Sequence, residues 1–246
     1  MILFLTSSPC SNDVPEGLDI PCILNEANEF VAELSRSWKP DSQCLIISSD
    51  PENFEMNDEM METFYHAFSY HGLTISDMAV CDERNASDIA DLIAMSDAII
   101  LAGGHVPTQN AFFEWLGLKE LIQDYEGIVM GISAGTMNCA DTVYAQPELD
   151  GESIDPDYQR WIPGLGLTDV MILPHYQEVR ENILDGKRLY EDITYPDSMG
   201  NRFYVLVDGS YVLVQDGRCE LRGEGYLIED GCIVQICEEG EFVELK

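Results

Sequence analysis

The sequence predicts an α/β fold: a three-layer sandwich with a mostly parallel central sheet and C-terminal β-hairpins. Two observations predict it. In the first half, short apolar runs rich in β-formers alternate with longer segments of helical periodicity, which is typical of βαβ units. After about residue 165, closely spaced strand patterns separated by turn pairs replace that alternation. The length of 246 residues suits one large α/β domain, expected over residues 1–246.

Five parallel strands are predicted in the first half from runs of Ile, Val and Leu, which suit strands buried on both faces. Their expected ranges are Ile2–Thr6, Cys44–Ser48, Thr74–Val80, Ala98–Leu101 and Ile128–Gly131. The clearest helix is expected to begin near Pro107, a favoured first helical position, and to stop before Gly127. The apolar side of that helix, expected to face the core, carries Phe112, Trp115, Leu116 and Ile122.

Five more strands are predicted in the last third of the chain. Their expected ranges are Phe203–Val207, Tyr211–Gln215, Glu220–Ile228, Ile233–Cys237 and Phe242–Leu245. Three Asp-Gly pairs are expected to turn hairpins between them, at Asp208-Gly209, Asp216-Gly217 and Asp230-Gly231.

The composition argues against several classes of partner. The 46 acidic residues against 12 basic ones give a formal charge of −34, which repels nucleic-acid backbones and anionic membrane surfaces. No apolar run approaches the roughly 20 residues that a membrane helix needs, and the first residues lack the pattern of a signal peptide. We therefore expect a cytoplasmic protein without nucleic-acid or membrane partners.

The cysteine and ligand patterns predict no cofactor. None of the eight cysteines forms a C-x-x-C pair, so we expect buried reduced thiols rather than disulfides. No spacing of His, Cys, Asp or Glu resembles a zinc or calcium site, and neither a phosphate-binding loop nor a dinucleotide fingerprint is present. We expect neither a metal nor an organic cofactor.

The strongest chemical motif is Gly131-Ile132-Ser133-Ala134-Gly135, which follows a buried strand and begins a helix. This G-x-S-x-G spacing predicts a nucleophile elbow with Ser133 at its tip, because the flanking glycines leave room for a strained central residue. The amide of Ala134 would then stabilise a developing oxyanion. The alternative is that Ser133 only caps a helix. The position at a strand's carboxyl end, where open α/β sheets bind ligands, favours catalysis.

A second glycine pair, Gly103-Gly104, ends the preceding strand. Gly104 is expected to supply the second oxyanion donor, although the pair could also form only a tight βα turn. Among the four histidines, His175 follows the apolar run of residues 170–174 and is the expected base. His105 lies near the site as a candidate binding residue, whereas His66 and His71 fall at a helix end or on its surface.

The acid that would orient the base has three candidates. Asp208 ends a predicted strand, Glu148 lies in the loop after the nucleophile helix, and Glu178 follows His175 by about one helical turn. They are ranked in that order, because a strand end fixes a side chain better than a loop does.

Taken together and in this order, four segments resemble peptidase family S51, which includes peptidase E, an aspartyl dipeptidase, and cyanophycinase. The segments are Ala102-Gly103-Gly104 with Gln109, the Ser133 motif with Asn138, Leu173-Pro174-His175-Tyr176, and Val207-Asp208-Gly209-Ser210. The resemblance implies a class I glutamine amidotransferase-like, flavodoxin-like fold with Ser133 as nucleophile and His175 as base. It leaves the acid open between Glu148 and Asp208.

The resemblance also implies a substrate. A serine-type peptidase of this family would cleave small peptides, with dipeptides carrying an N-terminal aspartate as the candidate class. Gln109 and Asn138, which belong to the resembling segments, are expected with His105 in the binding set. Recognition of aspartate needs a nearby cation, for which the candidates are Arg160, Arg180, Lys187 and Arg188, with Arg180 taken into the expected site. One departure from peptidase E is His105-Val106-Pro107-Thr108, which replaces a Gly-Asn-Thr-type run.

Three other functions compete with a peptidase. In α/β-hydrolase esterases the base normally closes the chain, whereas 71 residues follow His175. Glutamine amidotransferases need a cysteine at the position of Ser133 and usually a glutamate at that of Gln177. A non-catalytic binding protein could retain the elbow as architecture. The family resemblance also makes a homodimer the candidate assembly.

Overall fold

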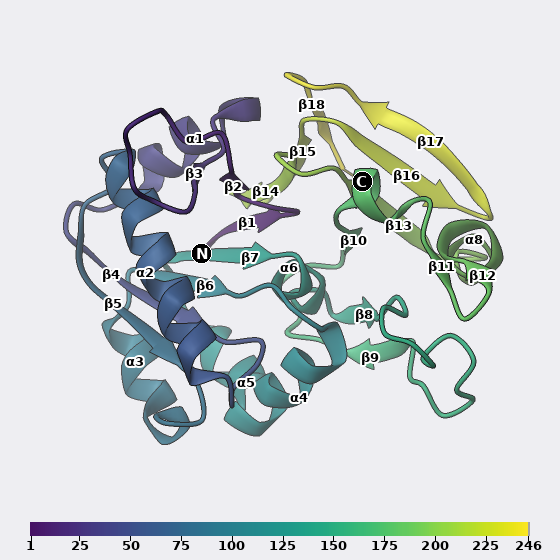
Figure 1. Ribbon diagram of the computed structural model, residues 1–246, viewed down its shortest axis with the longest axis horizontal. Coiled ribbons are helices and arrows are strands. Elements are labelled where there is room, and N and C mark those ends of the chain that lie inside the picture. Colours follow the sequence, from purple (N-terminus) through teal and green to yellow (C-terminus); the bar gives the residue numbers. More distant parts are fainter. Residues whose placement is uncertain (246) are drawn as a thin grey trace.

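The computed structural model describes residues 1–245, so Lys246, the last residue of the expected domain, lies outside the described residues. A large sheet of eight strands crosses the molecule (Figure 1). In spatial order its strands are β18 (Phe242–Glu244), β15 (Arg218–Arg222), β14 (Tyr211–Gln215), β1 (Ile2–Thr6), β7 (Ile128–Ile132), β6 (Ala98–Leu101), β4 (Ser42–Ile47) and β5 (Ile75–Cys81). The five strands from β1 to β5 in this order run parallel, and β14, β15 and β18 add an antiparallel edge.

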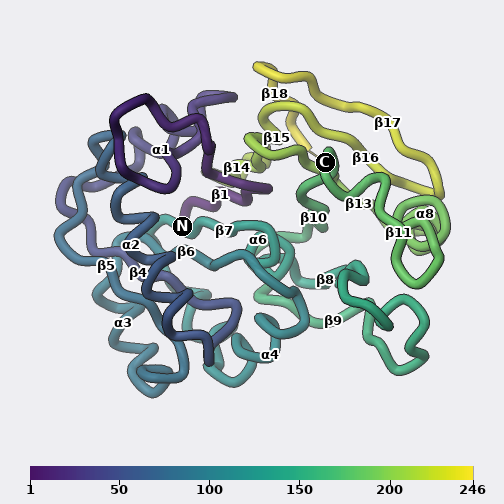
Figure 2. The backbone as a smooth tube through the Cα atoms, viewed as in Figure 1, coloured from purple at the N-terminus to yellow at the C-terminus, as the bar shows by residue number. Residues whose placement is uncertain are grey.

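A second sheet packs against the antiparallel end of the first. It consists of β10 (Met171–Leu173), β13 (Arg202–Leu206), β16 (Gly225–Glu229) and β17 (Cys232–Cys237). Three two-stranded pairs complete the strands: β2 (Cys10–Ser11) with β3 (Ile23–Leu24), β8 (Thr142–Tyr144) with β9 (Trp161–Pro163), and β11 (Ile183–Leu184) with β12 (Lys187–Arg188). The N-terminus lies at the start of β1 and stands near the centre of the view in Figure 2.

Helices cover both faces of the large sheet. The helices that do so are α1 (Phe30–Ser37), α2 (Phe54–Tyr70), α3 (Ile89–Met95), α4 (Val106–Leu116) and α5 (Leu118–Ile122), with α6 (Ala134–Asn138) at the end of β7 and 3₁₀ turns at Ala27–Glu29 and Ala86–Asp88. The helices α7 (Tyr176–Val179) and α8 (Tyr195–Asp197) and a π-helical segment at Leu189–Thr194 lie with the second sheet. Successive strand residues point to opposite faces, so Phe4 packs with α1 and α2, whereas Leu3 and Leu5 pack with α3, α4 and α5. The α/β fold with helices on both faces of a mostly parallel sheet is therefore confirmed.

Most predicted strands form, but the run Glu220–Ile228 is wrong as one strand. Gly223 stands at φ +93° between β15 and β16, a conformation that side chains rarely adopt, and the chain turns there from the large sheet into the second. The Asp208-Gly209 pair is also not a hairpin turn, because β13 and β14 belong to different sheets.

The other two Asp-Gly hairpins are confirmed. Asp216-Gly217 joins β14 to β15 and Asp230-Gly231 joins β16 to β17, with positive φ at both residues of each pair. Two positive φ values are what a type I′ turn requires. A third pair, Asp185-Gly186, has the same signs of φ between β11 and β12 and was not anticipated.

The helix expected from Pro107 to the residue before Gly127 is two helices. Gly117 adopts φ +63° and separates α4 from α5. The chain changes direction there, so the apolar residues before and after Gly117 belong to two different helices. Phe112, Leu116 and Ile122 are buried as expected. Trp115 is not a core residue, since 61% of it is exposed.

The register of the parallel strands places four residues in a row at their carboxyl ends. Thr6 pairs with Ile132, Leu101 pairs with Gly131, and Ile47 pairs with Leu101. One or two residues beyond these pairs, Ser7, Ser133, Gly103 and Ser49 stand side by side. The topology therefore brings four chemically capable loop residues to one edge, where open α/β sheets bind ligands.

Candidate active site

Ser133 lies in the sharp turn between β7 and α6. Its backbone has φ +50° and ψ −110°, a strained conformation for a residue with a side chain, and its amide donates to the carbonyl of Thr6 at 3.1 Å. A Cβ on Gly131 would lie 2.7 Å from the Cα of Thr136, and one on Gly135 would collide with the carbonyl of Leu101. Both flanking glycines are therefore required sterically, as a nucleophile elbow demands.

Two backbone amides flank this turn. Ala134 is the first residue of α6, so its N–H has no acceptor within the helix. The glycine loop that follows β6 packs against the elbow, because a Cβ on Gly103 would lie 3.4 Å from the Cβ of Ser133. Gly104 and Ser133 line the same cavity.

The cavity beside Ser133 has a volume of about 260 Å³. Its polar lining includes Gly104, Ser133, Gln146, Glu148, His175 and Asn182. Its apolar lining includes Val106, Met137, Val179, Leu184 and Leu189. No Lys or Arg side chain lines it anywhere in residues 1–245, which leaves Glu148 as its charged wall. A cavity this small suits a ligand about the size of a dipeptide.

Two loops wall the outer side of this cavity. The loop between β8 and β9 lies beside the β11–β12 turn (Figure 2), where the carboxylate of Asp185 accepts from the amide of Gly151 at 2.9 Å and from the hydroxyl of Ser153 at 2.8 Å. In a second contact between the two loops, the ammonium group of Lys187 donates to the carbonyl of Ser153 at 2.8 Å. These bonds fix the two loops against each other and keep the cavity narrow.

His175 follows β10 and Asp208 lies just beyond β13. Because β10 and β13 are parallel neighbours, their carboxyl ends meet, and the Nδ1 of His175 lies 2.7 Å from the Oδ1 of Asp208. Each of the two side chains is 27% exposed. His175 also lines the cavity with Ser133, although no hydrogen bond joins their side chains within the described residues. In unliganded enzymes such bonds are often loose and tighten only with substrate.

Two residues outside the predicted site, Ser7 and Gln177, hold this pair. The hydroxyl of Ser7 donates to the Oδ1 of Asp208 at 2.6 Å and accepts from the amide of His175 at 2.8 Å. The amide side chain of Gln177 donates to the Oδ2 of Asp208 at 2.7 Å and accepts from the Asp208 amide at 3.1 Å. Asp208 is thus fixed from both sides, as an acid that orients a base must be.

The charges at this site shift the pKa values of its members. Burial disfavours the charged form of His175, but the hydrogen bond and charge of Asp208 outweigh it and raise the pKa of His175 above its ordinary value. Burial opposes ionisation of Asp208 as well, yet the hydrogen bonds from His175, Ser7 and Gln177 lower its pKa. Asp208 therefore remains ionised beside an imidazole that it holds.

In the described chain, no hydrogen bond joins the carboxylate of either of the other two candidate acids to the ring of His175. Glu148 faces the cavity, and the protein around it raises its pKa chiefly by desolvation. Glu178 lies close to both His175 and Asp208, and the three residues offer ligand atoms within 4.8 Å of one another. Such a group could hold a cation, but the carboxylate of Asp208 already accepts hydrogen bonds at both oxygens.

Several predicted binding residues lie outside the cavity lining. The ring of His105 bonds to Thr108 at 2.7 Å and to Glu152 at 2.8 Å. Gln109 and Asn138 are fully buried and bonded to each other at 3.0 Å. Gln109 also donates to the carbonyl of Ala102 at 2.7 Å, so this pair braces the glycine loop against the elbow helix.

The four candidate cations are also absent from the lining. Arg160 pairs with Asp197 at 2.6 Å, Arg188 pairs with Asp192 at 2.7 Å, and Lys187 belongs to the loop contact described above. Arg180, with 54% of its side chain exposed, lies 3.7 Å from Glu181. The structure therefore gives no cation for an aspartate side chain inside the cavity.

The remaining sequence expectations concern residues away from the site. Of the two other histidines, His66 is exposed on α2 and His71 caps the C-terminal end of that helix. All eight cysteines are free thiols. No helix among residues 1–245 combines the length and apolar character needed to cross a membrane.

Comparison with known proteins matches the chain to a family of sequences and to a solved structure. The model of peptidase family S51 matches residues 51–222, a range that holds Ser133, His175 and Asp208. No curated protein sequence matches the chain. A crystal structure assigned as a peptidase E from Listeria monocytogenes EGD-e shares its fold with a TM-score of 0.59. The match covers 96% of this chain and 98% of that one at 14% sequence identity.

Proposed function

The chain belongs to peptidase family S51 and is a peptidase, and on this premise we propose that it is a serine-type enzyme that cleaves small peptides through Ser133, His175 and Asp208. The observation that carries the proposal is the 2.7 Å contact between His175 and Asp208, with His175 and Ser133 on one cavity. An ionised carboxylate on Nδ1 fixes the imidazole tautomer, so that Nε2 is free to take a proton.

The reaction would follow the usual course of acyl transfer. The hydroxyl of Ser133 attacks the scissile carbonyl and passes its proton to His175, while the amides of Gly104 and Ala134 hold the oxyanion. Collapse of this intermediate breaks the C–N bond, and His175 returns the proton to the leaving amine. Water then attacks the acyl-enzyme with His175 again as base, releasing the second fragment and restoring Ser133.

The cavity supports a substrate different from the aspartyl dipeptides suggested by the resemblance. Its charged wall is the carboxylate of Glu148, which forms no hydrogen bond or ion pair in the described chain and suits a substrate ammonium group. The apolar side, which includes Met137, Val179 and Leu189, suits an uncharged side chain. We therefore extend the proposal to short peptides with a free amino terminus and an apolar first residue.

A serine-directed fluorophosphonate probe tests the chemistry independently of substrate. Labelling is expected for the wild-type protein and should disappear in Ser133→Ala and fall by orders of magnitude in His175→Gln. Folded wild-type protein that resists the probe would overturn the proposal and favour a non-catalytic binding protein.

Paired substrates test the cavity. The wild type is expected to cleave leucyl and alanyl dipeptides faster than aspartyl ones, and to cleave N-acetylated versions poorly. Glu148→Gln should lose most of the preference for the free amine, roughly tenfold or more, because it removes one charge-assisted hydrogen bond. A wild type that prefers aspartyl dipeptides would refute this part of the proposal while leaving the serine chemistry intact.

A further inference from the structure

Ser49, outside the proposed catalytic groups, contacts the glycine loop directly. It follows β4 and stands beside Gly103 in the register of the parallel strands. Its hydroxyl donates to the carbonyl of Gly103 at 2.5 Å. A Cβ on Gly104 would lie 2.7 Å from the Cβ of Ser49, so the two residues are packed as closely as a glycine permits.

This hydrogen bond sets the direction of one amide. In a planar trans peptide the C=O and N–H groups point in opposite directions. Because the carbonyl of Gly103 points at Ser49, the N–H of Gly104, which belongs to the same peptide unit, points away from Ser49. Ser133 packs on the Gly103 side of the loop and lines the cavity together with Gly104. The bond thus fixes the direction of the Gly104 N–H, on the side of the loop opposite to Ser49.

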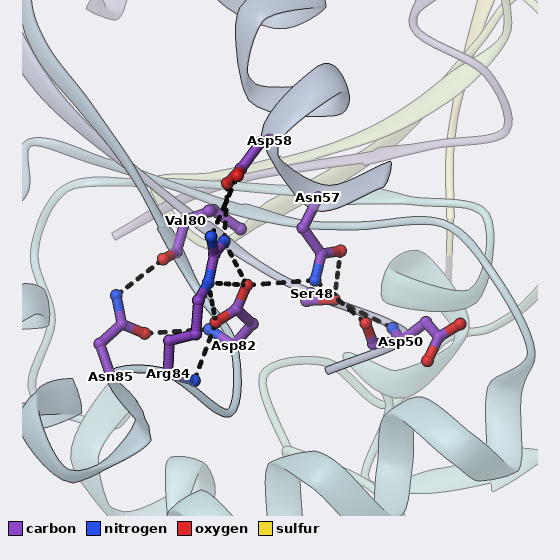
Figure 3. Close-up of polar contacts among 8 residues, drawn as sticks. All are labelled: Ser48, Asp50, Asn57, Asp58, Val80, Asp82, Arg84 and Asn85. Carbon is purple, nitrogen blue, oxygen red and sulfur yellow. Dashed lines mark hydrogen bonds and ion pairs between the residues drawn. The ribbon is translucent and has the colours of Figure 1, made fainter. Parts of the chain in front are cut away.

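The segment that carries Ser49 is itself fixed by a buried polar network (Figure 3). The hydroxyl of Ser48 donates to the side-chain carbonyl of Asn57 at 2.8 Å and accepts from the amide of Asp50 at 3.0 Å. Asn57 in turn donates to the carbonyl of Asp50 at 3.0 Å and to Asp82 at 3.2 Å. Both neighbours of Ser49 in the chain are therefore held in place.

Asp82 anchors the far side of this network. It is fully buried, and its carboxylate accepts from the amide and the guanidinium of Arg84, with distances from 2.7 to 3.1 Å, and from Asn57 (Figure 3). Arg84 also pairs with Asp58 of α2 at 2.6 Å. The network connects β4, β5 and α2, so the Ser49 hydroxyl is presented from rigid elements rather than from a free loop.

We infer that Ser49 is a positioning residue that aims the Gly104 amide at the transition-state oxyanion. The inference rests on the proposed serine-peptidase chemistry. Ser49 itself does not touch the substrate, and its loss should weaken stabilisation of the transition state more than binding of the substrate.

The test compares Ser49→Ala with a matched control, Ser35→Ala, which removes a similar bond from a serine hydroxyl to a backbone carbonyl on the exposed face of α1. For Ser49→Ala we expect kcat and the rate constant of fluorophosphonate labelling to fall by about 10- to 100-fold, less than the loss of an entire oxyanion donor. KM should change by no more than about threefold. Ser49→Thr, which keeps the hydroxyl, should restore most of the rate, and Ser49→Cys, a weaker donor, should be intermediate.

Each outcome supports or overturns the inference. Equal labelling of folded Ser49→Ala and Ser35→Ala would overturn it, and so would a loss confined to KM. If Ser49→Ala fails to fold, the series from wild type through Thr to Cys carries the test, and equal rates across that series would overturn the inference. Failure of the probe on the wild-type protein would instead reject the proposed function.

Discussion

Replacing Asp208 with Asn should change both the rate and its dependence on pH. The substitution keeps the size of the side chain but removes the charge that lies 2.7 Å from the His175 ring. An asparagine can donate to Nδ1 and so favour the tautomer in which Nε2 already carries a proton. That imidazole cannot accept the proton of Ser133, and we expect kcat/KM and the labelling rate to fall by roughly 10³–10⁴-fold.

The dependence of the rate on pH gives a second readout of the role of Asp208. The base works only when neutral, so activity is lost as the pH falls below the pKa of His175, which Asp208 raises from the ordinary 6.5. The acid limb of wild-type activity should therefore lie above pH 6.5 and move to lower pH in Asp208→Asn, because the charge and hydrogen bond that favour the imidazolium are lost while the burial that disfavours it remains.

The assay is fluorophosphonate labelling followed from pH 5 to pH 9, with residual activity measurable over hours. Asp141→Asn serves as the control, because it makes the same change in a side chain that is 72% exposed and away from the cavity. Wild-type rates and an unshifted limb in Asp208→Asn would refute the assignment of the acid. If Glu148→Gln lost labelling instead, Glu148 would be the orienting acid.

Three further predictions concern stability. Ser133→Gly should be more stable than Ser133→Ala by about 1 kcal/mol, or about 2–4 °C in Tm, because glycine accepts φ +50° with less strain; equal Tm values would contradict the strain at the elbow. Asp82→Ala should lower the free energy of unfolding in urea by about 2–3 kcal/mol, since it removes a buried carboxylate that accepts from both Asn57 and Arg84, whereas a midpoint equal to that of Asp141→Asn would contradict this role. Gly117→Ala should cost about 1–2 kcal/mol in thermal unfolding because residue 117 stands at φ +63°, and an unchanged Tm would show that the break between α4 and α5 tolerates a side chain.

Local sequence patterns were sufficient to predict the strands and turns whose ends depend only on their own residues. The strands at Ile2–Thr6, Ala98–Leu101 and Tyr211–Gln215 begin and end at the predicted residues. Each is a short β-forming run bounded by residues that interrupt it. The two Asp-Gly hairpins were predictable for the same reason, because the turn type depends on two residues alone.

Choices between sheets could not be predicted from local pattern. Residues on both sides of Gly223 favour strands equally, and the partner of each strand is decided by packing between segments distant in sequence. The outward position of Trp115 also depends on packing, because the buried face of α4 runs through Phe113 and Leu116 and leaves Trp115 outside it. The extent of the helix was wrong for another reason. One left-handed residue, Gly117, ends α4 and starts α5 in a new direction, so a single helical periodicity does not describe the two helices.

In the candidate site, too, some features follow from local sequence and others depend on the pairing of distant segments. Ser133 and His175 could be found because each follows a strand and carries a recognisable chemical group. The choice of Asp208 over Glu148 as the partner of His175 depends on the pairing of β10 with β13, which the sequence does not state. Ser7 and Ser49 were missed, although each also directly follows or nearly follows a parallel strand. The rule that identified Ser133, applied to every strand end, would have drawn attention to both.

The two-sheet origin of the site also bears on protein synthesis. A nascent chain that has reached residue 170 contains Ser133 and both oxyanion amides, but neither His175 nor Asp208. Ser7 is synthesised among the first residues, but its hydroxyl can bridge His175 and Asp208 only after both have been synthesised. Under the proposed mechanism, the ribosome would therefore carry an inert hydrolase until β13 had emerged and docked, and no neighbouring nascent peptide would be cleaved before then.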